Sequence, residues 1–352
     1  MRKIMFVALL TFVGATHGYA QNARLKDKTS GSLTADSVNV FYKALFKAFK
    51  VAYLHRGTID WKNVEAETYE HLRQYNSFDS SLREITNLFD RINATHCLVY
   101  RADSKFTVTR KIIPKERYTT QWKEKYNSKP SFEVKLLGGK YGYILVPQMV
   151  LFDNSAVNMR KTAQPLYDQI AKLKSDHKVE GWIIDLRFNT GGNATPMLLA
   201  LYDFLANQEI WSELDEDKKI VRTYRMANGS YLQKSQKIAS IKPTGELLDK
   251  AKVALITGIF TGSSGEVTAL AFKGRPGSIF IGENTAGFTT SNMSVPLPFN
   301  STLALTTGYD GNRDGIYYPY ISPDVVVSKQ DNFEDLMKDL NVKEAIRFID
   351  TK

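Results

Sequence analysis

The chain has 352 residues, a formal net charge of +10, 43% hydrophobic residues and a single cysteine, Cys97. That length is enough for two or three structural units with apolar cores. One cysteine excludes a disulfide within the chain and disfavours a cysteine-based zinc site. The basic residues are scattered, with a loose concentration between positions 105 and 140. This favours a solvated surface and argues against a nucleic-acid partner.

The first twenty residues have the pattern of a secretory signal peptide. Arg2 and Lys3 precede an apolar run, and Gly18-Tyr19-Ala20 ends it, so we expect cleavage after Ala20. The alternative is an N-terminal membrane anchor, but the run is shorter than the ~20 apolar residues that span a bilayer. No later run is long enough either, so we expect no integral membrane segment after cleavage. The pattern predicts an exported protein, periplasmic or extracellular.

Residues 21–98 are predicted to form an N-terminal helical domain. After a polar start, apolar residues recur at helical spacing, as in Phe41, Leu45 and Phe49. Asp60 stands directly before Trp61 as a candidate N-cap of a second helix. Residues 99–140 alternate β-branched and charged residues, which indicates a hairpin and a β connector.

Residues 141–352 are predicted to form an α/β (α+β) core, because strand-like and helix-like segments alternate. Expected strands lie at 141–146, 181–186, 253–257, 278–282, 303–307 and 325–327. Expected helices lie at 156–174, from 195, from about 263, and at 333–349, and 212–250 reads as a polar excursion. Loops at the carboxyl ends of such strands are where α/β proteins place their sites.

Two segments of this core could carry acyl-transfer chemistry. The segment at 185–192 ends a buried strand with Gly191-Gly192, and the N–H group of one of these glycines could stabilise an oxyanion. A tight turn explains the same glycines without chemistry. In the second segment, Ser263 opens a helix, so the helix dipole could favour charge developing on its hydroxyl, and the N–H of Ser264 could complete the oxyanion hole. The spacing of Ser263 and Glu266 also fits a capping box.

A histidine base, if the chain has one, is predicted at His96. Once the leader is removed, only His55, His71, His96 and His177 remain. His55 and His71 lie within the helical segment, and His177 lies in a charged turn. No two histidines stand at metal-ligand spacing, so we expect neither a metal nor another cofactor. Cys97, the neighbour of His96, is expected to be buried and not part of a Cys–His pair.

Taken together, these segments resemble the C-terminal processing (tail-specific) and tricorn-core serine peptidases. The resemblance rests on five segments in order: 88–96, with Ala94 or Thr95 where the family has Asp, then 184–192, 263–266, 282–287 and 321–324. The resemblance implies a crotonase/ClpP-like core and hydrolysis of peptide or protein substrates through an acyl-enzyme on Ser263. Glu266 would support the helix of the nucleophile. A PDZ domain needs ~80–100 residues, which the 99–140 segment cannot hold.

The family contains two catalytic styles, and the resemblance favours one of them. Processing peptidases use a lysine at the place where this chain has Phe288, whereas the tricorn-like branch uses a histidine that falls on His96. That branch also orients its histidine with a late carboxylate, for which Asp310 and Asp314 are both candidates. The rival interpretation is a catalytically silent or esterase-like protein on the same fold that binds apolar or peptide ligands, as retinoid-binding relatives do.

Overall fold

The computed structural model describes residues 35–109, 113–151 and 153–351. The leader expected at residues 1–20, and its cleavage point, lie outside the described residues. The structure combines helices with two β-sheets, which confirms the α/β class expected from the sequence. Within the described ranges, no helix combines the length and apolarity needed to cross a bilayer.

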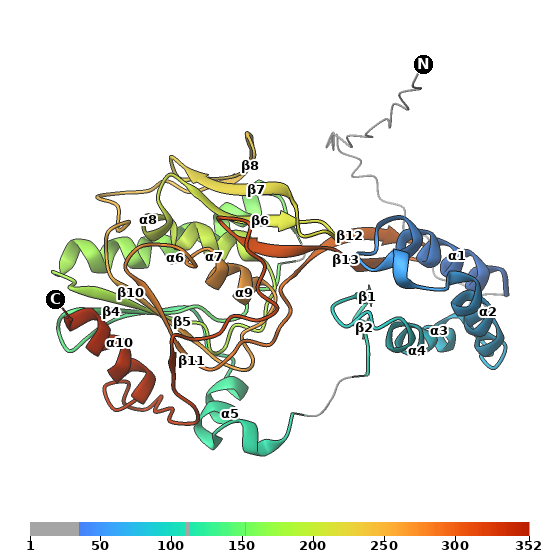
Figure 1. Ribbon diagram of the computed structural model, residues 1–352, viewed down its shortest axis with the longest axis horizontal. Coiled ribbons are helices and arrows are strands. Elements are labelled where there is room, and N and C mark those ends of the chain that lie inside the picture. Colours follow the sequence, from blue (N-terminus) through green and yellow to red (C-terminus); the bar gives the residue numbers. More distant parts are fainter. Residues whose placement is uncertain (1–34, 110–112, 152, 352) are drawn as a thin grey trace, which may run out of the picture.

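A six-stranded sheet with the order β14-β11-β10-β5-β4-β3 forms the centre of the C-terminal part (Figure 1). All neighbouring pairs are parallel except the edge pair of β3 and β4. The strands are β3 (Glu133–Leu137), β4 (Tyr141–Leu145), β5 (Gly181–Asp185), β10 (Val253–Thr257), β11 (Ser278–Gly282) and β14 (Val325–Val326). Every residue of β4, β5 and β10 is buried, as expected for parallel strands covered on both faces.

Helices cover both faces of this sheet because its side chains alternate in direction. Trp182 and Ile184 of β5 pack into the cluster that contains the apolar residues of α6, α7 and α9, whereas Ile183 packs into the cluster that contains those of α10. The helices are α6 (Ala156–Asp176), α7 (Ala194–Ala200), the short α8 (Tyr202–Leu205), α9 (Ser264–Leu270) and α10 (Leu340–Asp350). α9 follows the central strand β10, which places the start of this helix at the carboxyl edge of the sheet.

The closing helix is shorter than the sequence indicated. Expected over 333–349, it begins at Leu340 because Asp339 caps it, accepting the Val342 N–H at 3.1 Å. The other oxygen of the same carboxylate accepts a bond from Arg187 at 2.8 Å. Arg187 therefore links the end of β5 to the first turn of α10.

A second sheet contains eight strands in the order β2-β1-β13-β6-β7-β8-β9, with β12 paired to β13. The polar excursion expected at 212–250 is in fact largely strands of this sheet. The sequence missed them because the unbroken charged run at 215–219, which forms the turn between β6 and β7, makes the whole region look polar. The strands are β1 (Leu98–Arg101), β2 (Ser104–Phe106), β6 (Glu209–Leu214), β7 (Ile220–Ala227), β8 (Ser230–Gln233), β9 (Gln236–Ser240), β12 (Thr290–Leu297) and β13 (Ser301–Asn312).

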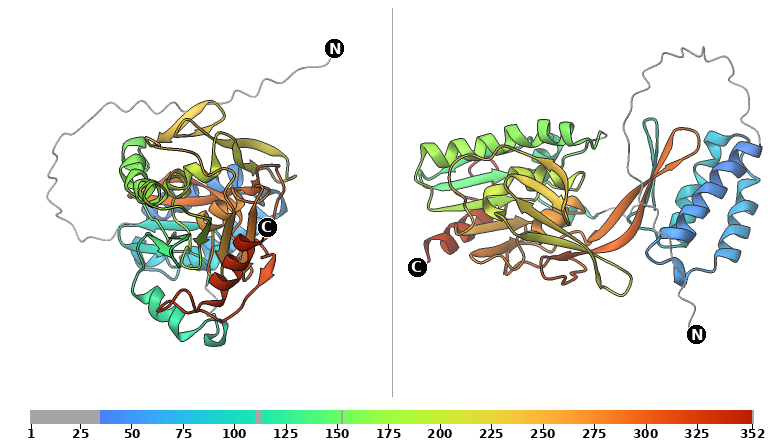
Figure 2. Two further views of the ribbon diagram at one scale, coloured as in Figure 1. Left: turned by 90° about the vertical axis from the view of Figure 1, so that its left-hand side faces the viewer. Right: turned by 90° about the horizontal axis from the view of Figure 1, so that it is seen from above.

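β12 and β13 form a long ribbon that runs from the core to the N-terminal helices (Figure 2). One end of β13 pairs with β1 and the other end with β6. The ribbon residues Leu297, Leu303 and Leu305 share an apolar cluster with the N-terminal helices. These helices are α1 (Ala35–Ala52), α2 (Trp61–Leu72), α3 (Phe78–Ser81) and α4 (Glu84–Arg91), with a 3₁₀ turn, η1 (Arg56–Thr58), after α1.

Local sequence explains the helical part well. Phe41, Leu45 and Phe49 of α1 are fully buried, and Asp60 caps α2 by accepting the Asn63 N–H at 3.2 Å. The connector that follows contains a further 3₁₀ turn, η2 (Lys115–Arg117), and the helix α5 (Thr120–Asn127). The sequence did not indicate α5.

Candidate active site

Ser263 lies in the sharp turn between β10 and α9. Its φ of 53° and ψ of −119° belong to a region that side-chain-bearing residues avoid, at a cost of about 1–3 kcal/mol. Gly191 packs directly against it, since a Cβ at Gly191 would lie 3.0 Å from Ser263 Cβ. The turn therefore holds the serine in a strained position against the glycine loop, as nucleophilic serines at strand-to-helix turns are held.

Glu266 fixes this turn from below with a fully buried carboxylate. Its Oε2 accepts the N–H groups of Ser263 at 2.9 Å and Phe288 at 2.8 Å. Its Oε1 accepts the Gly287 N–H at 2.8 Å and the Thr285 hydroxyl at 2.5 Å. Burial raises the pKa of Glu266, and these four donors act in the opposite direction. The capping interaction expected from the sequence is therefore part of a larger set of hydrogen bonds, which joins the turn at Ser263 to the loop at 285–288.

His96 reaches the serine from a distant part of the chain. Its Nε2 lies 3.1 Å from Ser263 Oγ, and its Nδ1 lies 2.7 Å from Thr290 Oγ1. For Nε2 to accept the serine proton, Nδ1 must carry the ring proton and donate it to Thr290. Burial lowers the pKa of His96 to about 4, and the contact with Thr290 acts weakly in the other direction. The imidazole is therefore neutral at neutral pH, because its pKa lies well below the ordinary histidine value of ~6.5.

The other histidines that the structure describes have different surroundings. The His71 side chain lies 3.1 Å from Glu84, the His55 ring packs on Tyr309, and His177 follows the last turn of α6. The elimination that selected His96 from the sequence thus agrees with its place beside Ser263.

The start of β12 holds the histidine at two points. The Thr290 hydroxyl contacts the imidazole ring, and the Asn292 amide donates to the His96 carbonyl at 2.8 Å. Asp310 of β13 holds the residues on either side of Thr290. Its N–H donates to the Thr289 carbonyl at 3.0 Å, and its carboxylate accepts the Ser291 hydroxyl. Burial raises the pKa of Asp310 to about 7.

No carboxylate orients His96 directly within the described residues. Asp314 lies with Asn312, whose amide is 3.3 Å from its carboxylate, and with Gly274, so it is not the partner of Nδ1. Asp310 contacts the neighbour of Thr290 and not the histidine. The sequence could not single out Thr290, because a threonine at a strand start carries no distinctive pattern.

The glycine loop lies against the first turn of α9. The Gly191 N–H donates to Asn189 Oδ1 at 3.2 Å within its own loop, and the Ser264 hydroxyl donates to the Gly192 carbonyl at 2.7 Å. The Ser264 N–H is in the first turn of the helix, where backbone donors have no intrahelical acceptor. The positions of Ser264 and Gly192 therefore fit an oxyanion site beside Ser263.

An ion cluster supports this loop from beneath. Arg187, 3% exposed, contacts Asp185, Asp331 and Asp339 at 2.6–2.8 Å. Its carbonyl accepts the indole N–H of Trp122 at 3.3 Å. The Asp-Leu-Arg part of the motif is thus structural, and it fixes the end of β5 from which the glycine loop departs.

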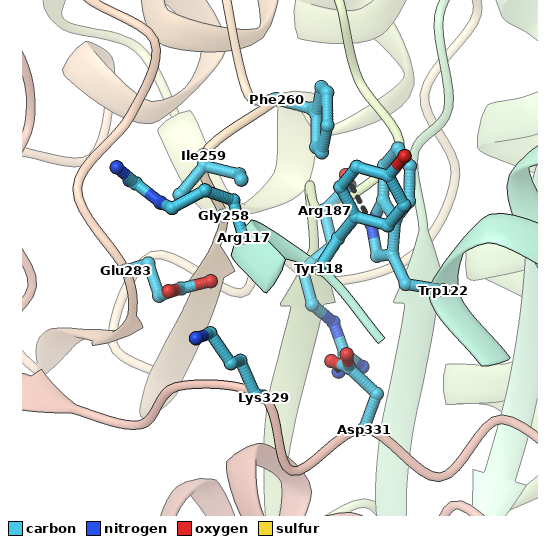
Figure 3. Close-up of a pocket in the computed structure, with 10 residues that line it drawn as sticks. All are labelled: Arg117, Tyr118, Trp122, Arg187, Gly258, Ile259, Phe260, Glu283, Lys329 and Asp331. Carbon is cyan, nitrogen blue, oxygen red and sulfur yellow. Dashed lines mark hydrogen bonds and ion pairs between the residues drawn. The ribbon is translucent and has the colours of Figure 1, made fainter. Parts of the chain in front are cut away.

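A small cavity of about 20 Å³ lies beside this cluster, lined by the ten residues drawn in Figure 3. Trp122 and Phe260 are stacked there with ring centroids 4.1 Å apart. Ser263 and His96 are not among the lining residues, and a space of this size holds about one water molecule. It is therefore a feature of the support and not of the candidate site.

Two residues bear on whether a lysine or a histidine could act as the base: Phe288, which stands where processing peptidases have their lysine, and Lys273. Phe288 packs its ring on His96, with centroids 5.1 Å apart. Lys273 lies over the Phe280 ring with its Nζ 3.4 Å from the Ser322 carbonyl.

Among the described residues, no group of three or more metal-ligating side chains gathers, and Cys97 is buried with a free thiol.

Comparison with protein families decides the relationship. The model of peptidase family S41 matches residues 140–327, which is more than half of the chain. The chain belongs to peptidase family S41. The matched range contains Ser263, Glu266, Thr290 and the glycine loop, whereas His96 lies before it.

Individual proteins are similar to this chain in sequence or in fold. The nisin-resistance protein of Lactococcus lactis subsp. lactis is 36% identical over 149 residues, which cover 41% of this chain and 45% of that protein. The match thus spans less than half of the relative. A lipoprotein from Streptococcus agalactiae has the same fold, with a TM-score of 0.60, 22% identity, and coverage of 87% of this chain and 94% of its own. A peptidase candidate from Parabacteroides merdae gives a TM-score of 0.55 at 15% identity, covering 90% and 97%.

The strained backbone at Ser263 predicts a stability difference between two inactive variants. Both Ser263→Gly and Ser263→Ala remove the hydroxyl, but only glycine adopts a positive φ without strain. We expect Ser263→Gly to exceed Ser263→Ala in free energy of unfolding by about 1 kcal/mol, measured by urea denaturation. Equal stability of the two variants would show that the turn is not strained at this residue.

The contact between Thr290 and His96 predicts a loss of serine reactivity when the hydroxyl is removed. Thr290→Val keeps the shape but leaves Nδ1–H without its acceptor. We expect the rate at which a fluorophosphonate labels Ser263 to fall about tenfold, the equivalent of one hydrogen bond. Thr290→Ser keeps the hydroxyl and serves as the matched control, with a rate near that of the wild type. A wild-type rate in Thr290→Val would mean that another group orients the imidazole.

Proposed function

We propose that this chain is an exported serine peptidase that hydrolyses peptide bonds through an acyl-enzyme on Ser263, with His96 as the general base. The observation that carries the proposal is the 3.1 Å contact between His96 Nε2 and the hydroxyl of Ser263. A nucleophile within hydrogen-bond reach of a base, which a third group orients, is the arrangement that activates a hydroxyl. Here the third group is the hydroxyl of Thr290.

In the proposed mechanism, neutral His96 takes the proton of Ser263 as the oxygen attacks the substrate carbonyl. The N–H groups of Ser264 and Gly192 hold the resulting oxyanion, a contribution of about 3–4 kcal/mol per donor. Of the two glycines that the sequence offered, Gly192 is favoured because the Gly191 N–H already donates to Asn189. The imidazolium then protonates the leaving amine, and water releases the acyl group by the same route.

The threonine partner has a consequence for the rate. A carboxylate on Nδ1 would stabilise the imidazolium by its charge, whereas a neutral hydroxyl supplies orientation with little of that stabilisation. Burial without a counter-charge is also what lowers the pKa of His96 to about 4. A base of such low proton affinity takes the serine proton less readily. We therefore expect slow acylation that depends strongly on substrate binding.

The proposed substrates are peptides or proteins. Membership of peptidase family S41 supports this class, and one relative is named for resistance to nisin. The proposal of export rests on the leader pattern of residues 1–20.

The second candidate is a binding protein on the same fold, and it is favoured because no carboxylate among the described residues contacts the His96 ring, whose Nδ1 instead lies at Thr290. A site without a carboxylate beside the histidine could hold peptides without cleaving them. Reaction with a fluorophosphonate separates the two, since an enzyme is labelled at one serine and a binder is not.

The identity of the base predicts how three variants behave. Ser263→Ala should abolish cleavage of a mixed set of peptides that includes nisin. Mass spectrometry of the peptides measures this cleavage. His96→Ala should lower the acylation rate by about 10²–10⁴-fold, the usual contribution of general base catalysis. Lys273→Ala is the control and should retain the wild-type rate, because its amine lies at Phe280 and Ser322. Loss of acylation in Lys273→Ala together with normal acylation in His96→Ala would refute the histidine base.

A further inference from the structure

Phe288 presents an aromatic surface at the two reacting side chains. Its ring packs on the His96 ring with centroids 5.1 Å apart. It also lies beside the residue before the nucleophile, since a Cβ at Gly262 would be 3.4 Å from Phe288 Cδ2. Despite these contacts, the residue remains 37% exposed. The ring thus packs on His96 and lies beside Gly262, the neighbour of Ser263, and it still leaves apolar surface uncovered.

A single oxygen atom fixes the backbone of Phe288 relative to that of the proposed nucleophile. Oε2 of Glu266 accepts the Phe288 N–H at 2.8 Å and the Ser263 N–H at 2.9 Å. The Gly287 N–H is held by the other oxygen of the same carboxylate. The backbone of Phe288 is therefore held in place relative to Ser263 and its ring packs on His96, so the ring is a preorganised contact surface.

The chemistry of the proposed reaction shows which part of a substrate would meet the ring. Because His96 returns its proton to the leaving amine, that nitrogen has to come within hydrogen-bond reach of Nε2. The side chain on the residue that carries the amine then lies beside the imidazole, where the Phe288 ring packs. The acyl side of the substrate instead faces the oxyanion donors of Ser264 and Gly192.

We propose that Phe288 forms the apolar contact surface for the residue that follows the scissile bond, so that bonds preceding apolar residues are cleaved preferentially. This inference rests on the proposed function, because it requires an acyl-enzyme on Ser263. Polar side chains at that position gain nothing from the ring and lose water, and one apolar contact of this kind discriminates by about tenfold.

Acyl transfer to added amines tests this surface without any other part of the substrate. The acyl-enzyme is formed from an activated ester, and leucinamide or serinamide is added to compete with water. The amine nitrogen attacks the ester carbonyl, a C–N bond forms, the C–O bond to Ser263 breaks, and the amine proton passes through His96 to Oγ. This step is the reverse of acylation, so it uses the same leaving-group site.

The readout is the ratio of amide to acid product, measured within each protein so that differences in overall rate cancel. For the wild type we expect leucinamide to be preferred over serinamide by about tenfold. Phe288→Ala should reduce this preference to about one, and Phe288→Leu should keep most of it. Val51→Ala, at a residue that is 69% exposed on α1, is the matched control and should keep the wild-type ratio.

Two outcomes would overturn the inference, and they differ in what else they refute. An unchanged preference for leucinamide in Phe288→Ala would show that the ring only shields His96 from water, and the proposed function would stand. No acyl-enzyme from the activated ester in the wild type would refute the proposed function together with the inference.

Discussion

The buried carboxylate of Glu266 is the constraint on which the rest of the site depends. Its four hydrogen bonds tie the turn at Ser263 to the loop at 285–288, and that loop continues directly into β12. β12 in turn carries Thr290, which orients His96. The nucleophile and the support of the base are thus fixed to each other through one side chain, although the two segments belong to different sheets. A buried anion that is fully hydrogen-bonded in this way is costly to disturb, because each lost partner leaves an unsatisfied polar group.

His96, the proposed base, lies outside the range that the family model matches, in the segment between the N-terminal helices and β1. His96 lies between α4 and β1, where the N-terminal helices pack on the ribbon of β12 and β13 and β1 pairs with β13. The histidine is then held by its ring, through Thr290, and by its backbone, through Asn292. The proposed site therefore combines Ser263, which lies within the matched range, with His96 from the N-terminal part.

The sequence predicted the central elements well because their signals are local. β10 and β11 have the expected bounds, since short buried runs between turn residues are unambiguous. Ser263 and His96 could be selected because motif order and elimination left few alternatives. The strands at 209–240 were missed, since the charged turn at 215–219 makes the region look polar. The closing helix was predicted too long because nothing in the sequence marked Asp339 as the residue that caps it. The partner of His96 was out of reach for a similar reason, because nothing in the sequence around Thr290 indicates a contact with a residue 194 positions away.

The central claim is that a neutral, buried histidine activates Ser263, and the pH dependence of fluorophosphonate inactivation tests it most directly. The second-order rate constant would be measured from pH 3.5 to pH 10, with the label located by peptide mapping. A pKa of about 4 for His96 means that deprotonation, and with it reactivity, is complete well below neutral pH. We therefore predict labelling at Ser263 with a single rising limb centred below 6.5 and a plateau above it. A limb centred above pH 8, as an amine base would give, or a label on another residue would contradict the account.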